Sequence, residues 1–431
     1  MLYKIFFKKR YDYLTYKKQI YEKFTCEKDQ NIIVIDKFNK LWKQAYNQIP
    51  FYNYWKKEHS LPEKITNFQE LYNFPILTSE IIRDHKDKII SKNDKYTIST
   101  GGSTGKPTVF PGANKNYLDF FSNIHMGRGW WNINPQEKKL LIWGHSHLFG
   151  TGIRGQINQY ISIIKNYLNN TKKLDAYNMS ASNIETYYNK MLSFKPDVII
   201  GYTSALVRLA DYIINNKFQS EINFRIKAVI PTAENITDYD VSLIEKAFLS
   251  KVVIEYGMAE AGVIAYSYKE TRNLKIFWDS FICSIKQDEL IITTLDRQQF
   301  PLINYATKDI VETDGKNKFN VRYLNKIHGR KKDFYEVKNL NSKENYIMSG
   351  IFAVHAIKQY KGILSVQIKL VKEKKIKIQI TSNNHINLKD LKRFFFLQTK
   401  LDFPNIDEKD FEFEQVLKAK VAISGKENIT I

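Results

Sequence analysis

Short apolar runs that alternate with helical patterns between residues 140 and 295 constrain the fold of this chain most strongly. Each run is short enough for one strand, and the runs cover residues 140–143, 198–200, 228–230, 252–254 and 290–292. Between the first two runs, Ser182 and Glu185 form a capping-box pattern that opens a helix, and Pro196 helps to end it. Strands that are joined by helical crossovers predict an α/β fold.

The pattern changes after Gly329-Arg330, where a charged run follows. Residues 364–370 and 376–380 alternate apolar with polar side chains, residues 388–401 have a helical pattern, and residues 411–414 alternate again. This mixture predicts a small α+β domain. We therefore predict a domain boundary that separates residues 1–328 from residues 329–431.

The composition is that of a globular protein. With 431 residues, of which 43% are hydrophobic, the chain can bury at least one large core. Charged residues interrupt the longest apolar stretches, so no membrane span is predicted, and the first ten residues lack the pattern of a signal peptide. We expect a cytoplasmic protein. Cys26 and Cys283 lie too far apart for metal-ligand spacing.

The net charge is +21, from 66 Lys and Arg against 45 Asp and Glu. Such a charge would suit an acidic carrier protein, an acidic polysaccharide precursor, nucleic acid or anionic lipid. The lysines, however, are scattered along the whole chain and form no single basic stripe. Charge alone therefore does not favour nucleic-acid binding.

Residues 99–108 read STGGSTGKPT and combine glycines, hydroxyls and a lysine in one short segment. Glycines let backbone N–H groups approach phosphate oxygens, while the hydroxyls and the lysine add hydrogen bonds and charge, so the segment predicts an ATP-phosphate loop. It is not a Walker A loop, because Thr100 stands where the first glycine belongs and Pro107 where a magnesium-binding hydroxyl belongs. The alternative is a surface turn without a ligand.

A second candidate site lies in residues 255–260, EYGMAE, directly after an apolar run. Tyr256 can stack on a purine, Gly257 permits close approach of the backbone, and Glu260 can hold Mg²⁺ beside phosphates. The alternative is an ordinary strand-turn-helix junction with Glu260 on the surface.

The order of these motifs resembles that of the AMP-forming adenylating enzymes, and within them the phenylacetate-coenzyme A ligase branch, especially its members associated with capsule and surface-polysaccharide biosynthesis. The resemblance covers nearly the whole chain. It is carried by residues 74–78 (FPILT), 99–108, 143–152 (WGHSHLFGTG), 228–234 (AVIPTAE), 255–260, 301–310 (PLINYATKDI), 329–333 (GRKKD) and 424–426 (SGK). It implies a large N-terminal domain with layered β-sheets and helices, and a mobile C-terminal domain.

The resemblance also implies roles for individual residues. The nucleotide-binding residues that it implies are Thr100, Gly101, Gly102, Ser103, Thr104, Gly105, Thr232, Ala233, Glu234, Tyr256, Gly257, Asp309 and Arg330. Among them, residues 232–234 would pack against adenine, Asp309 would accept hydrogen bonds from both ribose hydroxyls, and Arg330 would contact ribose or phosphate.

The remaining implied roles concern catalysis, the acid and domain movement. The implied catalytic residues are Lys106, Glu260 and Lys426, with Glu260 also the Mg²⁺ ligand; His147, Phe149 and Gly150 would shape the substrate pocket, and Lys332 would be the hinge. Lys418 and Lys420 compete with Lys426 for its role. A loop histidine with a structural role is the alternative for His147, and a metal site with His145 is not favoured because no Cys or carboxylate is near in the sequence.

Four positions depart from the pattern of the family. Ala259 stands where a threonine is usual, Asn304 where an arginine is common, Lys308 where a glycine often occurs, and Thr108 where many relatives carry a lysine or arginine. The first departure removes a hydroxyl that is expected near the α-phosphate.

The resemblance implies activation of a carboxylic acid by ATP, with Mg²⁺, to give an acyl-adenylate and pyrophosphate. The acyl group would then pass to coenzyme A, a carrier-protein thiol, or a sugar amine or hydroxyl. Two alternatives remain at this point: an acyl-protein synthetase in which Cys283 takes the acyl group, and a non-catalytic relative that only binds nucleotide.

Overall fold

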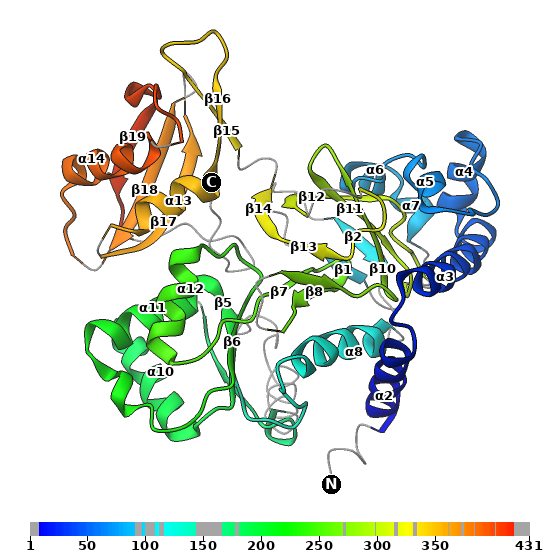
Figure 1. The fold of residues 1–431 in the computed structure, drawn as a ribbon, viewed down its shortest axis with the longest axis horizontal. Helices are drawn as coiled ribbons and strands as arrows, with labels where there is room; N and C mark the ends of the chain where they lie inside the picture. The colour runs from blue at the N-terminus through cyan, green and yellow to red at the C-terminus, as the bar shows by residue number, and fades with distance from the viewer. Residues whose placement is uncertain are drawn as a thin grey trace. The chain divides into compact units, whose positions relative to one another are not determined.

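The computed structural model divides into two compact units, each built from two stretches of chain (Figure 1). Unit 1 comprises Met1–Pro135 and Ile254–Ile327, and unit 2 comprises Gln136–Val253 and His328–Ile431. The residues that the structure describes are 8–90, 97–99, 108–111, 116–143, 166–176, 181–269, 273–297, 299–313, 318–330, 334–360, 362–371, 375–382, 384–400 and 402–417.

Unit 1 contains two four-stranded sheets and a short hairpin. One sheet has the order β10-β11-β12-β14, the other has the order β13-β9-β8-β7, and β1 pairs with β2. The strands are β1 (Thr97–Ser99), β2 (Val109–Pro111), β7 (Glu255–Met258), β8 (Gly262–Ser267), β9 (Leu274–Ile276), β10 (Phe281–Lys286), β11 (Glu289–Thr294), β12 (Tyr305–Glu312), β13 (Tyr323–Leu324) and β14 (Lys326–Arg330). The pairings β10–β11, β11–β12, β7–β8, β8–β9 and β9–β13 are all antiparallel.

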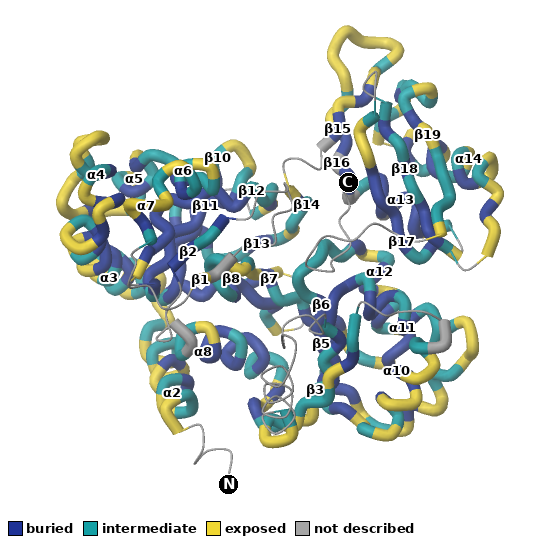
Figure 2. Tube along the Cα trace, turned by 180° about the vertical axis from the view of Figure 1, so that it is seen from behind, coloured by how far each residue is buried: buried dark blue, intermediate teal, exposed yellow. Residues whose placement is uncertain are grey.

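Helices of unit 1 pack around these sheets and bury large aromatic side chains. They are α2 (Lys8–Lys23), α3 (Glu27–Gln48), α4 (Pro50–Glu58), α5 (Phe68–Tyr72), α6 (Ser79–Asp84), α7 (Lys86–Ile89) and α8 (Asn116–Gly129). On α3 the buried residues recur at helical spacing, so one face of the helix joins the core. Trp42 from this face makes edge-on contacts with Phe74 and Tyr52. Figure 2 shows the strands of unit 1 as a mixture of buried and half-buried residues, and β8, β10 and β11 are buried at all but one position each.

The segment before the first hairpin is tied to β12 by its backbone. The Leu77 N–H donates to the Asn304 carbonyl at 3.0 Å, and the Ala306 N–H donates to the Leu77 carbonyl at 2.9 Å. The Asn304 side chain is buried and donates to the Phe74 carbonyl at 2.5 Å. Residues 74–78 therefore fix the beginning of β12, which carries Asp309.

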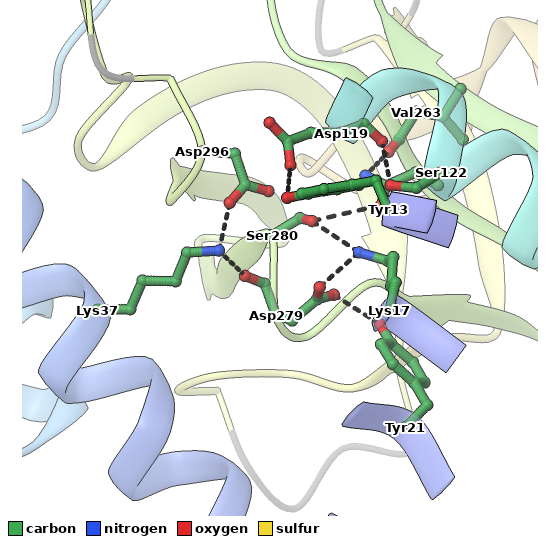
Figure 3. Close-up of polar contacts among 11 residues, drawn as sticks. Tyr13, Lys17, Tyr21, Lys37, Asp119, Ser122, Val263, Asp279, Ser280 and Asp296 are labelled. Atoms are coloured by element: carbon green, nitrogen blue, oxygen red, sulfur yellow. Dashed lines mark hydrogen bonds and ion pairs between the residues drawn. The ribbon is translucent and has the colours of Figure 1, made fainter. Parts of the chain in front are cut away.

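A buried polar cluster joins α2, α3 and α8 to the connections that follow β9 and β11 (Figure 3). Lys17 Nζ lies 2.5 Å from Asp279 Oδ2, and Tyr21 donates to Asp279 Oδ1 at 2.9 Å. Lys37 donates to the Asp279 carbonyl at 2.7 Å and pairs with Asp296. Both lysines lower the pKa of the Asp279 carboxyl, so it stays charged although it is buried.

The first part of unit 2 is a parallel sheet with helical crossovers. The order is β4-β3-β5-β6, with β3 (Lys139–Ile142), β4 (Thr171–Leu174), β5 (Val198–Tyr202) and β6 (Ala228–Thr232). Helices α10 (Ala181–Phe194), α11 (Thr203–Asn215) and α12 (Asp238–Phe248) lie beside one another next to this sheet (Figure 1). All five residues of β5 are buried, as its continuous apolar run predicts. The predicted α/β fold is confirmed.

The second part of unit 2 has a core of its own. Its strands are β15 (Phe334–Val337), β16 (Tyr346–Ser349), β17 (Ile363–Leu370), β18 (Ile376–Ser382) and β19 (Phe411–Gln415), and its helices are α13 (Gly350–Lys358) and α14 (Leu388–Thr399). In the sheet β17-β18-β19, β17 is antiparallel and β19 parallel to β18. The α14 side chains Leu391, Phe395 and Phe396 belong to a buried cluster with Ile378 and Phe411.

An ion pair joins α13 to α12 inside unit 2. Lys358 Nζ lies 2.7 Å from Asp240 Oδ1, and the exposed fractions of the two side chains are 10% and 1%. The other oxygen, Asp240 Oδ2, accepts from the Thr237 N–H at 3.0 Å and the Thr237 hydroxyl at 2.8 Å, which completes a capping box at the start of α12. Asp240 thus serves as a helix cap and as the partner of a buried lysine.

Residues 290–292 lie in a strand and residues 181–194 form a helix, as the sequence predicts, but three details of the local predictions are wrong. Residues 252–254 form only an isolated bridge between Val229 and Val252, because β7 begins at Glu255 in another sheet. Residues 290–292 belong to the antiparallel strand β11, not to the parallel series. Helix α10 already begins at Ala181, so Ser182 lies within it instead of capping it. The domain boundary at 328/329 stays a prediction, since unit 2 also includes residues 136–253.

None of the helices among the described residues has the length and apolar character that crossing a membrane requires.

Candidate active site

The EYGMAE segment forms β7 and the turn that leads into β8. The pairing of β7 with β8 shifts register between Tyr256 and Gly257, so the strand bulges there. A Cβ atom on Gly257 would lie 2.5 Å from the Gly262 carbonyl oxygen, which is closer than real Cβ contacts. Only glycine fits this position without a backbone shift, and the bulge sets the directions of the flanking side chains.

Tyr256 and Asp309 are brought together by this arrangement. The Tyr256 hydroxyl donates to Asp309 Oδ2 at 2.6 Å. Burial and the adjacent carboxylate raise the pKa of the Tyr256 phenol well above its ordinary value, so the phenol keeps its proton and acts as the donor. The Asp309 N–H in turn donates to the Thr307 hydroxyl at 3.1 Å. The two nucleotide-binding candidates from β7 and β12 are therefore direct neighbours.

Glu260 and Tyr305 form the second pair of this kind. The Tyr305 hydroxyl donates to Glu260 Oε1 at 3.1 Å, and Tyr305 is itself buried at the start of β12. The same two segments thus supply two carboxylates, Asp309 and Glu260, and each accepts a hydrogen bond from a tyrosine of the opposite segment. Carboxylates held in this way need little further ordering when a cationic or hydroxyl-bearing ligand binds.

A charged network lies behind the EYGMAE segment and was not foreseen from the sequence. Arg128 on α8 pairs with Glu255 at 3.5 Å, and the Tyr266 hydroxyl donates to the same Glu255 oxygen at 3.0 Å. Arg128 Nε also donates to the Tyr266 hydroxyl at 3.3 Å. The buried Arg128 and Tyr266 thus fix the half-buried Glu255, which is the first residue of β7. No sequence signal could have found them, because Arg128 is 127 positions away from Glu255.

In unit 2, the predicted residues 232–234 stand at the carboxyl end of β6. Thr232 is the last residue of the strand, and Ala233 has the left-handed backbone angle φ of 69°. Glu234 Oε2 accepts from the Ser204 N–H at 2.7 Å, at the beginning of α11. A carboxylate at a helix N-terminus is stabilised by the helix dipole. Glu234 therefore caps α11 in this structure.

Other predicted residues are exposed or lie outside the described part of the chain. Arg330 is exposed at the end of β14. The predicted site residues that fall outside the described residues are Thr100, Gly101, Gly102, Ser103, Thr104, Gly105, Lys106, His147, Phe149, Gly150, Lys332 and Lys426.

Three of the four departures from the family pattern have a local structural setting. Lys308 and Asn304 have φ angles of 66° and 54°, the left-handed region that glycine enters most easily. Lys308 also pairs with Glu80 at 2.8 Å. Thr108 is buried and accepts a hydrogen bond of 2.8 Å from Arg83 on α6.

Cys283 is in the interior of the β10–β11 pair. Its side chain is fully buried, and burial raises the pKa of its thiol to about 12. The thiol is therefore neither exposed nor ionised at neutral pH, which disfavours an acyl-cysteine intermediate at this position.

No family model matches the chain, but individual relatives do. The chain is 27% identical to the protein CapK of Staphylococcus aureus, over 99% of this chain and 94% of the relative. It is 23% identical to the phenylacetate-coenzyme A ligases of Pseudomonas putida and of Escherichia coli, over 69% of this chain and 70% of each relative.

Solved structures share the fold at lower sequence identity. A 2-hydroxyisobutyryl-CoA ligase, in the postadenylation state with an acyl-AMP, matches with a TM-score of 0.70 and 14% identity, over 93% of this chain and 89% of the other. The anthranilate CoA ligase AuaEII matches with a TM-score of 0.51 and 12% identity, over 76% and 64% of the two chains. The sequence relatives and the shared fold agree with the resemblance that the ordered motifs carry. The chain is similar to the AMP-forming adenylating enzymes, and within them to the phenylacetate-coenzyme A ligases.

Proposed function

We propose that this protein joins a carboxylic acid to ATP, releases pyrophosphate and forms an acyl-adenylate, which then passes its acyl group to an acceptor. The observation that carries the proposal is the pair of tyrosine-held carboxylates, Asp309 and Glu260, on neighbouring segments of unit 1. Asp309 would bind the ribose hydroxyls and Glu260 would face the phosphates. The relatives with coenzyme A ligase names support the reaction class.

In the first step, a carboxylate oxygen of the acid attacks the α-phosphorus of ATP, and the bond to the bridging oxygen of pyrophosphate breaks. Such a displacement needs positioning and charge neutralisation more than covalent help from the protein. Lys106 and Lys426 would supply positive charge toward the phosphates. In the second step, the acceptor attacks the acyl carbon and AMP leaves.

The residues around Glu260 fit a magnesium ion that is bound mainly through a nucleotide. Within the described residues, no three His, Cys, Asp or Glu side chains gather into a protein-only metal site. Mg²⁺ commonly takes one or two carboxylates plus substrate phosphates. Glu260 would be that carboxylate, and the ion, when bound, would neutralise phosphate charge.

Carboxylate-dependent exchange of labelled pyrophosphate into ATP tests the proposal. Wild type should exchange with at least one acid of a broad panel, and Glu260→Gln should lose exchange by about 100-fold or more. Glutamine keeps an oxygen for the Tyr305 hydroxyl, so the variant should fold. Nucleotide binding by wild type without exchange for any acid would instead identify a non-catalytic relative.

The role of Lys426 can be separated from that of its neighbours. Lys426→Ala should abolish exchange, whereas Lys418→Ala and Lys420→Ala, in the same tail, should retain it. Loss of exchange only in Lys418→Ala or Lys420→Ala would transfer the role to that residue.

The acceptor is proposed from the relatives. Coenzyme A is the acceptor named for the ligase relatives. A carrier-protein thiol, or a sugar amine or hydroxyl in surface-polysaccharide biosynthesis, is the alternative acceptor that the sequence motifs leave open. Once the acid is known, the consumption of the acyl-adenylate with coenzyme A, with a carrier-protein thiol and with amino sugars decides among the acceptors.

A further inference from the structure

Arg297 is a buried cation to which the proposed reaction assigns no role. It lies in the connection between β11 and β12, and only 6% of it is exposed. Its Nη2 donates to the Pro111 carbonyl at 3.2 Å, while Nη1 is buried without a hydrogen-bond partner among the described residues. A buried guanidinium with an unused donor is costly, so this donor requires an explanation.

Arg297 contacts strand β2. Pro111 ends β2, and the adjacent Phe110 ring lies under the guanidinium with 6.0 Å between its centroid and Cζ. In the sequence, β2 follows directly on the Gly-rich segment. Burial lowers the pKa of Arg297 to about 10, against the opposing effect of the Glu260 carboxylate, so the group stays charged at neutral pH.

The charge of Arg297 is not neutralised by a partner within the described part of the chain. Among the residues that the structure describes, no carboxylate forms an ion pair with it, although Glu260 is near enough to influence its pKa. Glu260 instead accepts from Tyr305. An uncompensated guanidinium near the proposed phosphate-facing carboxylate suits a multiply charged anion, because its planar fork matches phosphate oxygens.

We propose that Arg297 binds the polyphosphate of ATP, and hence pyrophosphate, through its unpartnered Nη1 while Nη2 holds the end of β2. This inference rests on the proposed function. Arg297 is a cation that lies outside the sequence motifs. In this proposal Arg297 contacts the polyphosphate, whereas Asp309 contacts the ribose.

Arg322 supplies a matched control in the same unit. It is a half-buried arginine whose Nη1 is buried and lacks a partner among the described residues. Its Nη2 donates to Asn31 Oδ1 at 2.6 Å and its guanidinium lies 5.9 Å from the Trp278 ring centroid. Arg297→Met and Arg322→Met should therefore cost similar stability, but only the first should change anion binding.

The test measures binding of pyrophosphate and of AMP by calorimetry, with folding checked by thermal melting. We expect Arg297→Met to weaken pyrophosphate binding by about tenfold or more and AMP binding by less than about twofold, with Arg322→Met unchanged for both. Arg297→Lys keeps the charge without the fork and should be intermediate. It also serves as the test variant if Arg297→Met does not fold.

Several outcomes would overturn the inference. Equal pyrophosphate affinities for the Arg297 and Arg322 variants would reduce Arg297 to a structural role, as would parallel losses of AMP and pyrophosphate binding. If wild type exchanges pyrophosphate and the Arg297 variants have the same KM for pyrophosphate as wild type, the proposed function stands and the role of Arg297 is wrong. If wild type binds pyrophosphate through Arg297 but exchanges with no acid, the anion site stands and the reaction falls. Wild type that binds neither ATP nor pyrophosphate overturns both.

Discussion

The Tyr256 hydroxyl donates a 2.6 Å hydrogen bond to Asp309, so the candidate purine platform and the candidate ribose ligand are one unit. The bond joins β7 to β12 across 53 positions of sequence. A change at either residue should therefore affect how the other meets the nucleotide.

Tyr256→Phe tests this coupling. The variant keeps the ring but removes the hydrogen bond to Asp309, and hydrogen bonds to charged groups contribute about 1.5–3 kcal/mol. We expect the KM for ATP in pyrophosphate exchange to rise about tenfold, with a smaller change in kcat. Arg322→Met is the control for general destabilisation of unit 1. An unchanged KM for ATP would show that Asp309 is positioned without Tyr256.

Tyr305→Phe should act on the other carboxylate. It removes the donor at 3.1 Å from Glu260 Oε1 while the buried ring remains. We expect the Mg²⁺ concentration for half-maximal exchange to rise about threefold or more, with little change in the KM for the acid. A larger effect on the acid than on Mg²⁺ would contradict the placement of Glu260 beside the phosphates.

The Lys358–Asp240 ion pair should be a major stabilising contact of unit 2. Lys358→Met leaves Asp240 buried without its cation, and breaking a buried pair in this way costs about 3–5 kcal/mol. Lys400→Met breaks a half-exposed pair with Glu408 and should cost less than about 1 kcal/mol. Urea unfolding measures both. Equal losses would mean that the buried pair contributes no more than a surface one.

Asp119 should make the stability of unit 1 fall as the pH rises. Burial and the nearby Asp296 carboxylate raise its pKa to about 6, against the opposing effects of Tyr13, Lys17 and Lys37. The native state therefore binds more protons than the unfolded state between about pH 4 and pH 6, and the contribution of Asp119 is lost across this window. Asp119→Asn should thus gain stability over wild type by up to about 3 kcal/mol between pH 4 and pH 7.

Asp279→Asn is the control of opposite sign for this experiment. The pKa of Asp279 is lowered by Lys17 and Lys37, so its charged form stabilises the native state above the ordinary pKa of an aspartate. The variant should lose stability relative to wild type as the pH rises from 3 to 5. Parallel stability curves for wild type and Asp119→Asn would contradict the assignment for Asp119.

The sequence predicted what depends on local pattern. The parallel strands β3, β5 and β6 follow from apolar runs. The ordered motifs predict Glu260 and Asp309 as site residues, and the structure places them on neighbouring segments. Residues 252–254 show the limit of this reasoning, because an apolar run reports burial and does not say which strand it pairs with.

The rest of the site depends on contacts between distant parts of the chain. The pair Arg128–Glu255 and the buried Arg297 arise only when helices and loops pack together, and a charged residue in a sequence normally predicts exposure. Their burial and hydrogen bonds in the folded protein identify both features.

The two thiols of this chain give it a built-in chemical reporter. Cys26 is exposed and Cys283 is buried between β10 and β11, and the chain has no other cysteine. A fluorescent maleimide should label the native protein once, at Cys26 near the start of α3. Labelling of Cys283 as well would measure the fraction of molecules in which the β10–β11 sheet has opened. The folded fraction of any variant can therefore be measured in the same sample as its ligand binding.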